Sequence, residues 1–291
     1  MTSIVILKRR INSIKGTRQI TKALQLVAAS KMKKAQDYAS KSRSYSELAN
    51  ELMTRLSGIN ELKNYTFFKK RPIKSKLYVV VSSNTGLAGA YNSNIYRYFS
   101  NQVKVDLDSN IKVKVLAIGN KAAHFVRRIE SIELIGLYNN LANQPSANDI
   151  RPILNSIIKE YLTEAVDEVV FVFTKFLSNV NQQVEGLTVL PASMVTSDNK
   201  AIKSDNFSNF EPDVDTVINE ITTRLIEAQL WQAILGSLAS EHSMRMIAMK
   251  NATDNAKDLI DDYTLELNTA RQANITQELA EISGGVEAMN S

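Results

Sequence analysis

A heptad pattern of small and apolar residues runs through the last quarter of the chain almost without interruption. Stepping alternately by four and three, it reads Val214, Ile218, Ile221, Leu225, Ala228, Gln232, Leu235, Ala239, His242, Met246, Met249, Thr253, Ala256, Ile260, Tyr263, Leu267 and Ala270. No proline follows Pro212, and Gly236 is the only glycine from there to Gly284. A period held this long is typical of a coiled coil. A helix of some 70 residues is about 105 Å long, whereas a compact domain of this size is roughly 50 Å across. We therefore expect this helix to protrude and to need a partner.

Residues 1–60 carry a weaker stripe of the same spacing, and the charged residues beside it have the opposite sign. The stripe reads Ile4, Leu7, Ile11, Ile14, Arg18, Thr21, Gln25, Ala28, Met32, Ala35, Ala39, Ser42, Ser46, Ala49, Met53 and Leu56. Up to Ser46 there are 11 basic residues and a single acid, whereas from Glu211 onward fourteen acids face five bases. Opposite charges beside an apolar seam select a partner and an orientation, although each exposed ion pair contributes only about 0.2–1 kcal/mol. We predict that residues 1–60 and 211–285 form the two helices of a long antiparallel coiled coil.

The middle of the chain, residues 70–205, alternates short apolar runs with amphipathic helical patterns. The sequence predicts strands at Leu77–Val81, Val113–Ile118 and Val169–Phe173, with weaker candidates at Ile132–Ile135 and Val184–Leu190. Helical patterns separate them at about 92–101, 121–129 and 148–164. This alternation is typical of a mostly parallel sheet covered on both faces. The predicted fold class is α/β plus a long antiparallel coiled coil, with a Rossmann-like sheet domain inserted between the N- and C-terminal helices.

The two predicted helices differ in length although both start from the inserted domain. The first has about 55 residues and the second about 70, so Met1 should lie beside roughly Leu267. The residues after Leu267 would then form a helix without a partner in this chain, and such a helix is marginal in water. We expect it either to fray or to be enclosed by other polypeptides.

Few residues suit catalysis or metal binding. The chain has no cysteine, which excludes disulfides, thiolate metal sites and thiol catalysis. Its two histidines are distant: His124 lies next to a helical apolar run, and His242 lies on the C-terminal seam, where a polar residue can set the register. Asp258, Asp261 and Asp262 fall within about one helical turn, and a solvated acidic face is the ordinary explanation. We expect no catalytic residue, metal or cofactor in this chain.

The segment Ser82–Asn92 follows the first predicted strand and opens a helix, which is where dinucleotide-binding domains hold phosphate. It contains two glycines rather than three and no Gly-Lys-Ser/Thr, so neither nucleotide fingerprint is met, and a tight turn is the favoured interpretation. Two alternative functions stay open at this point. One is a nucleotide-using enzyme with a coiled-coil arm, and the other is a coiled-coil protein that binds nucleic acid through its basic first helix.

Four segments resemble the gamma subunit of F-type ATP synthases and occur in the same order as in that family. They are Ile20–Met32, Gly86–Asn92, Ala239–Asn255 and Ala270–Leu279. The resemblance implies a central rotor shaft that turns inside a hexamer of three alpha and three beta subunits, with its α/β domain resting beside the epsilon subunit on the membrane c-ring. It implies a non-catalytic subunit without cofactor, nucleic acid or small-molecule ligand. The implied location is the cytoplasmic face of a bacterial plasma membrane, with an organelle inner membrane as the alternative.

The same resemblance implies which residues meet partners. A polar group matches the family positions that engage a loop of the beta subunit, Arg245 matches a shaft arginine that contacts beta, and Leu24 stands where many relatives carry Met. Val286 stands where the family usually has Ala. A third group falls in the segment that in relatives lies near the c-ring and epsilon. The polar group is Arg271, Gln272, Thr276 and Glu278, and the third group is Phe207, Phe210 and Glu211.

Overall fold

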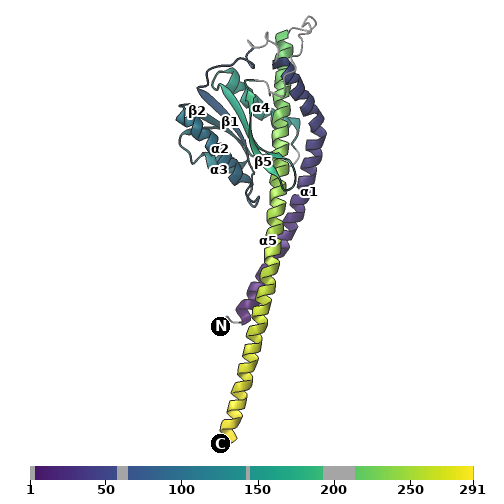
Figure 1. The fold of residues 1–291 in the computed structure, drawn as a ribbon, viewed down its shortest axis with the longest axis vertical. Helices are drawn as coiled ribbons and strands as arrows, with labels where there is room; N and C mark the ends of the chain where they lie inside the picture. Colours follow the sequence, from purple (N-terminus) through teal and green to yellow (C-terminus); the bar gives the residue numbers. More distant parts are fainter. Residues whose placement is uncertain (1–3, 58–64, 142–144, 193–213, 291) are drawn as a thin grey trace. The chain divides into compact units, whose positions relative to one another are not determined.

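The structure is a computed structural model that describes residues 4–57, 65–141, 145–192 and 214–290 (Figure 1). Two long helices, α1 (Ile4–Ser57) of 54 residues and α5 (Val214–Asn290) of 77 residues, open and close the chain. The molecule divides into two compact units. We call residues 1–28 with 245–291 the terminal helical pair, and residues 29–244 the sheet unit. The domain limits given from the sequence stay a prediction.

A five-stranded sheet in the order β3-β2-β1-β4-β5 forms the centre of the sheet unit. The first four strands are parallel, and β5 runs antiparallel to β4 at one edge. All five expected strands are therefore present, including the two weaker candidates, and the mostly parallel sheet is confirmed. The strands are β1 (Ser75–Val81), β2 (Lys112–Ile118), β3 (Ile132–Tyr138), β4 (Glu168–Phe176) and β5 (Gln182–Leu190).

Helices cover both faces of this sheet, as its continuous apolar strands require (Figure 1). Along β1, Tyr78 and Val80 join the core under two helices, whereas Leu77, Val79 and Val81 join the core on the opposite face. The first face is covered by α2 (Tyr91–Asp108) and α3 (Asn120–Val126), and the second by α4 (Ala147–Leu162) together with the first part of α5.

The first part of α5 packs on the sheet. The heptad pattern alone did not predict that this part of the helix has a different partner from the rest. Stripe residues such as Leu225 are buried there, and so are Ile226, Leu230 and Ile234, which lie off the stripe. This part of α5 is apolar on more than one side because it must contact more than one neighbour. Gly236 lies against β4, where an added Cβ would be 3.4 Å from the carbonyl oxygen of Thr174.

The terminal helical pair is antiparallel, as two cross-contacts demonstrate. The Thr253 hydroxyl donates to the Thr21 hydroxyl at 2.9 Å, and the Arg10 guanidinium lies 5.8 Å from the centroid of the Tyr263 ring. Moving up one helix therefore means moving down the other by nearly the same number of residues. The buried side chains all fall on the two predicted stripes, so the predicted seam is confirmed here. They are Leu7, Ile11, Thr21 and Ala28 from α1, and Met249, Thr253, Ala256 and Ile260 from α5.

Candidate partner-binding surface

The last part of α5 extends past the end of its partner helix. From the two cross-contacts, Ile4 is level with about residue 270 of α5. Ala270 is half-buried, and every side chain described beyond it, from Arg271 to Val286, is exposed. The predicted unpartnered end therefore begins within about one helical turn of its expected place. Figure 1 shows this end of α5 continuing beyond the N-terminus.

An exposed apolar stripe runs along this unpartnered end. Ile275, Leu279, Ile282 and Val286 are 47, 60, 64 and 54% exposed, and their spacing of four, three and four residues places them on one side of the helix. The earlier seam does not continue, because its next positions carry polar residues, Asn274, Gln277 and Glu281. The stripe therefore restarts one residue further round the helix. Contiguous exposed apolar side chains with a polar rim mark surfaces that meet another protein.

The four residues assigned to a beta-subunit loop flank this apolar stripe. At about 100° per residue, the stripe spans an arc of roughly 60°. Arg271 and Glu278 lie on one side of that arc, and Gln272 and Thr276 lie on the other. All four are exposed, and the Thr276 hydroxyl donates to the backbone carbonyl of Gln272 at 2.9 Å. The arrangement has the composition of a protein interface, with an apolar centre and polar or charged edges.

Arg245 and Leu24 do not belong to the same site. Arg245 is half-buried and lies about 39 Å before Arg271 along α5, from a rise of about 1.5 Å per residue. Leu24 is exposed on α1 beside Ile20 and Val27, which are also exposed and share its side of the helix. The sequence analysis singled out only Leu24 in this second apolar group. Phe207, Phe210 and Glu211 lie outside the described residues.

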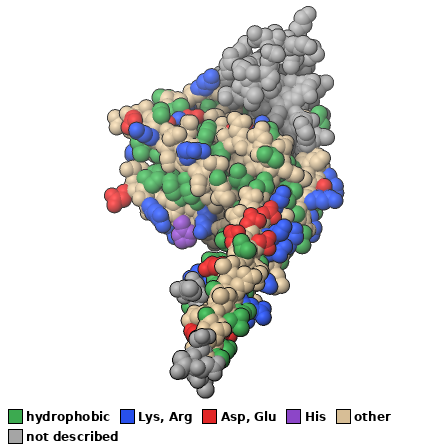
Figure 2. Space-filling view, turned by 60° about the horizontal axis from the view of Figure 1, so that its bottom comes forward, with side chains coloured by type: hydrophobic (Ala, Val, Ile, Leu, Met, Phe, Trp, Pro, Cys, Tyr) green, Lys and Arg blue, Asp and Glu red, His purple; other side chains and the backbone are tan. Residues whose placement is uncertain are grey.

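The exposed sides of the terminal helical pair carry opposite charges. In this pair, the acids from Asp254 to Glu281, including Asp258, Asp261 and Asp262, are solvent-exposed, as expected for an acidic face. The bases of α1 from Lys8 to Lys22, including Lys15, are exposed as well. Figure 2 shows red and blue side chains gathered next to one another on the helices. Among the described residues, no group of three His, Cys, Asp or Glu side chains could hold a metal ion.

The glycine-containing segment after β1 is a tight turn. Its side chains accept hydrogen bonds from backbone N–H groups at the start of α3. The Ala122 N–H donates to the Ser82 hydroxyl at 2.8 Å, and the Asn120 N–H donates to the Asn84 side-chain oxygen at 3.0 Å. These N–H groups open α3, which is the kind of place where a phosphate would otherwise bind. Gly89 has a φ of 55°, in the left-handed region that favours glycine. Side chains of the turn therefore already accept hydrogen bonds from these two N–H groups of α3.

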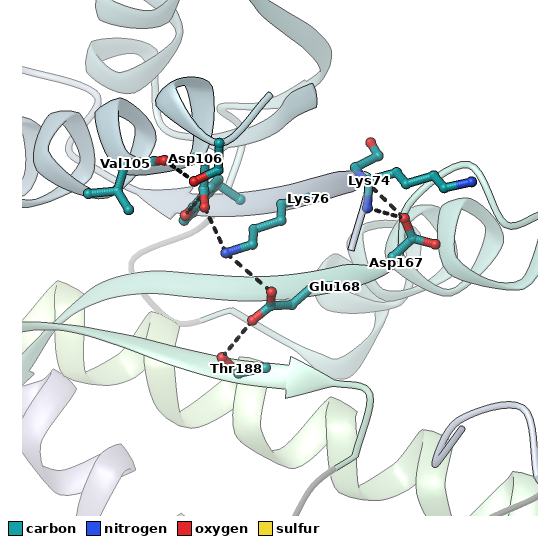
Figure 3. Close-up of polar contacts among 10 residues, drawn as sticks. Lys74, Lys76, Val105, Asp106, Asp167, Glu168 and Thr188 are labelled. Carbon is teal, nitrogen blue, oxygen red and sulfur yellow. Dashed lines mark hydrogen bonds and ion pairs between the residues drawn. The ribbon is translucent and has the colours of Figure 1, made fainter. Parts of the chain in front are cut away.

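A cluster of charged residues lies where β1 and β4 begin (Figure 3). The Lys76 ammonium lies between two carboxylates, 2.8 Å from Asp106 and 3.3 Å from Glu168. The Tyr78 hydroxyl donates to Asp106 at 2.5 Å, and the Thr188 hydroxyl donates to Glu168 at 3.2 Å. The sequence analysis missed this cluster because its members come from β1, α2, β4 and β5.

The protonation of the cluster follows from these contacts. Burial alone would lower the pKa of Lys76, but Asp106 and Glu168 outweigh it and raise that pKa above the ordinary value of 10.5. Burial, and then the hydrogen bond to Asp106, raise the pKa of the Tyr78 phenol. Lys76 therefore stays charged at neutral pH and is held between two carboxylates. Such internal neutralisation is typical of a structural ion pair rather than of a reactive group.

None of the described helices combines the length and the apolar composition needed to cross a lipid bilayer.

Comparison with known proteins identifies close relatives over the full length. The model of a family described as ATP synthase matches residues 3–289. The ATP synthase gamma chain of Macrococcus caseolyticus is 38% identical over 291 residues, covering 99% of this chain and 100% of that relative. The corresponding chain of Staphylococcus carnosus is 36% identical over 289 residues, with coverage of 99% and 100%.

Solved structures with the same fold come from ATP synthase assemblies. A chain of the Euglena gracilis mitochondrial ATP synthase, in an OSCP/F1/c-ring structure, superposes with a TM-score of 0.69 at 19% identity, covering 98% of this chain and 94% of that one. A chain of the Tetrahymena thermophila central stalk and c-ring gives a TM-score of 0.61 at 24% identity, covering 80% and 99%. At these identities the likeness supports the fold.

Proposed function

Because this chain belongs to the family of ATP synthase gamma chains, we propose that it is the central rotor shaft of an F-type ATP synthase. The observation that carries this proposal is the unpartnered end of α5, with its exposed apolar stripe between two polar edges. A single helix is marginal alone in water, and its exposed apolar stripe favours enclosure by another protein. The relatives give no support to a nucleotide-using enzyme or a nucleic-acid-binding protein.

Enclosure of this end would stabilise it without locking it at one angle. Full burial of a Val, Leu or Ile side chain contributes about 1.5–3 kcal/mol, so four such residues can seat the helix. The stripe covers only part of the circumference, and charged, polar and small residues occupy the rest. A ring of three alpha and three beta subunits would therefore contact a different face of the shaft at each catalytic site. Rotation changes which beta conformation is favoured, and the coupling is reciprocal, so ATP hydrolysis can drive the reverse rotation.

The partner contacts proposed here are those that the family resemblance implies. We assign Arg271, Gln272, Thr276 and Glu278 to a loop of the beta subunit, and Arg245 and Leu24 to separate contacts further along the shaft. The basic face of α1 suits an acidic surface of beta, through an attraction that salt weakens. Phe207, Phe210 and Glu211 are assigned to the foot that meets epsilon and the c-ring.

The chain acts in a membrane-associated complex and has no catalytic site, cofactor or small-molecule substrate in this proposal. Its bacterial relatives favour the cytoplasmic face of a plasma membrane as the location of that complex.

Co-expression with alpha and beta subunits tests the assignment. We expect a complex with one copy of this chain per three alpha and three beta subunits, with ATP-driven rotation of the shaft. Truncation after Leu267, or the double variant Leu279→Ser with Ile282→Ser, should weaken assembly and coupling. The matched control is Gln277→Ser, which changes the side of the same helix opposite the stripe and should leave both intact.

The readout must separate a lost contact from a misfolded chain. Trp231, the only tryptophan, packs against the core of the sheet unit, so its fluorescence should be the same in all variants. Unaltered assembly and coupled ATP synthesis in the truncated chain would refute the role of the unpartnered end.

A further inference from the structure

A pocket of about 330 Å³ opens in the sheet unit beside the carboxyl-terminal part of β4. It lies between α2, the start of β5 and Met244 of α5. The helices that connect the strands change faces between β1 and β4, because α2 covers one face and α4 the other. In open α/β sheets, ligands bind outside the carboxyl ends of the strands at this kind of reversal. The pocket therefore lies where the fold class places ligands, although the glycine-containing turn next to it has no phosphate fingerprint.

The lining of this pocket is polar, with a single positive charge. Arg97 supplies a guanidinium, and Asn94, Gln182 and Gln183 supply carboxamides, while the residues that line the pocket include no Asp or Glu. Arg97 is exposed and donates to the side-chain oxygen of Asn94 at 3.0 Å. Within the part of the chain that the structure describes, no carboxylate forms an ion pair with Arg97. Its remaining donors are available to an anion.

A buried hydroxyl also lines the pocket. Thr174 is only 3% exposed, and its side chain lies on the α2 face of β4, like those of Val170 and Val172. The backbone of Thr174 forms hydrogen bonds with side chains of α5. The Thr174 N–H donates to the Ser237 hydroxyl at 3.0 Å, and the Thr174 carbonyl accepts from the Ser240 hydroxyl at 3.4 Å. The Thr174 hydroxyl itself has no hydrogen-bond partner among the described residues. A buried polar group without a partner is costly, and it requires an explanation.

The wall of the pocket depends on a glycine in β5. A Cβ added to Gly186 would lie 2.7 Å from the phenol oxygen of Tyr98 and 3.2 Å from a ring carbon, which is too close for either group. The absence of a side chain at Gly186 therefore lets the Tyr98 ring lie directly on the edge strand, where it forms one side of the pocket.

We propose that this pocket binds a small molecule bearing an oxyanion, either a phosphate or a carboxylate group. The guanidinium of Arg97 presents a planar set of donors that matches both groups, and hydrogen bonds to a charged acceptor are stronger than neutral ones. The carboxamides donate further hydrogen bonds, and the Thr174 hydroxyl gains a partner. This site is independent of the rotor function, so its failure would leave that function untouched.

The test uses the full-length, isotopically labelled chain and follows backbone amide resonances by NMR. Inorganic phosphate and malonate are titrated separately at constant ionic strength, which tells a phosphate site from a carboxylate site. Arg97→Gln should weaken binding about tenfold or more, because it removes a charge-assisted hydrogen bond. Thr174→Val keeps the shape of the side chain and should also weaken binding, whereas Arg151→Gln, on the exposed side of α4, is the control.

Saturable shifts confined to the residues around the pocket, lost in Arg97→Gln and kept in Arg151→Gln, would support the proposal. No saturable shift with either anion would overturn it. Equal weakening by Arg97→Gln and Arg151→Gln would overturn it as well, since the anions would then be responding to net charge.

Discussion

Removing the Lys76 ammonium should destabilise the sheet unit strongly. The side chains of Lys76, Asp106 and Glu168 are only 17, 6 and 14% exposed, so Lys76→Met leaves two carboxylates close together with little water and no cation. Removing one partner of a buried ion pair lowers the free energy of unfolding by about 3–5 kcal/mol. The hydrogen bonds from Tyr78 and Thr188 remain and lessen that penalty. We therefore expect a loss of about 3 kcal/mol in the free energy of unfolding.

Urea unfolding followed by Trp231 fluorescence measures this loss, because Trp231 packs against the core of the sheet unit. The matched control is Lys114→Met. Lys114 contacts Glu160 at 3.0 Å, but these side chains are 20 and 25% exposed and only one carboxylate is involved. We expect the control to lose about 1 kcal/mol. Equal losses in the two variants, or a loss below about 1 kcal/mol for Lys76→Met, would refute the argument from buried charge.

The effect should also depend on pH in a defined direction. The pKa of Lys76 is raised in the folded chain, so its stabilising contribution is present at pH values below 10.5 and is lost as the pH rises through the folded-state pKa. Lys76→Met has no ammonium to lose at this position. The gap in the free energy of unfolding between the wild type and the variant should therefore narrow as the pH rises from 10.5 through the folded-state pKa of Lys76. A gap that stays constant or widens would contradict this account.

Three further substitutions test local features: two lie in the sheet unit and are followed by the same urea measurement, and one lies in the terminal helical pair. Ser146→Ala removes the cap of α4 and should cost about 1 kcal/mol. Hydrogen bonds from the backbone and side chain of Ser146 lower the pKa of Asp149, so this stabilisation is present above the usual pKa of 3.8 and should disappear as the pH falls below it. Gly119→Ala should lower the free energy of unfolding by more than about 1 kcal/mol. The φ of this residue is 97°, and the new Cβ would overlap the Ser82 backbone. Gly16→Ala should instead stabilise α1 by up to about 1 kcal/mol, measured by hydrogen exchange, since nothing lies within 4 Å of the added Cβ; a destabilised variant would contradict this reasoning.

The parts of the fold that follow from local patterns could be predicted from the sequence. The seam of the terminal helical pair is one example, because a period of 3.5 residues records which side of each helix is buried. The apolar runs of β1, β2 and β4 are another, because strands buried on both faces leave no polar alternation. The sequence also predicted β5, although it is an edge strand whose residues are mostly half-buried or exposed.

Features that depend on contacts between distant segments could not be predicted in this way. The cluster around Lys76 brings together residues that are far apart in the chain, and no local spacing of residues predicts it. The packing of the first part of α5 on the sheet was not predicted, because a search along one stripe ignores Ile226 and Leu230, which lie off that stripe. The apolar stripe from Ile275 was missed because it starts one residue out of step with the seam before it. A second search for the same spacing, started at each apolar residue after Ala270, would have found it.

The position of α5 at the end of the chain has a consequence for synthesis on the ribosome. One face of the sheet is covered by α4 and by a group of apolar residues of α5. Only the α5 part of this cover, Ile218, Leu225, Ile226, Leu230 and Ile234, is translated after every strand. At roughly 5–20 residues per second, some seconds separate the emergence of β5 from that of its cover. During this interval the nascent polypeptide exposes an apolar surface. We expect it to engage a chaperone at that stage. Ribosome-bound chains that have emerged only as far as residue 214 should be more prone to aggregation than chains that have emerged as far as residue 244.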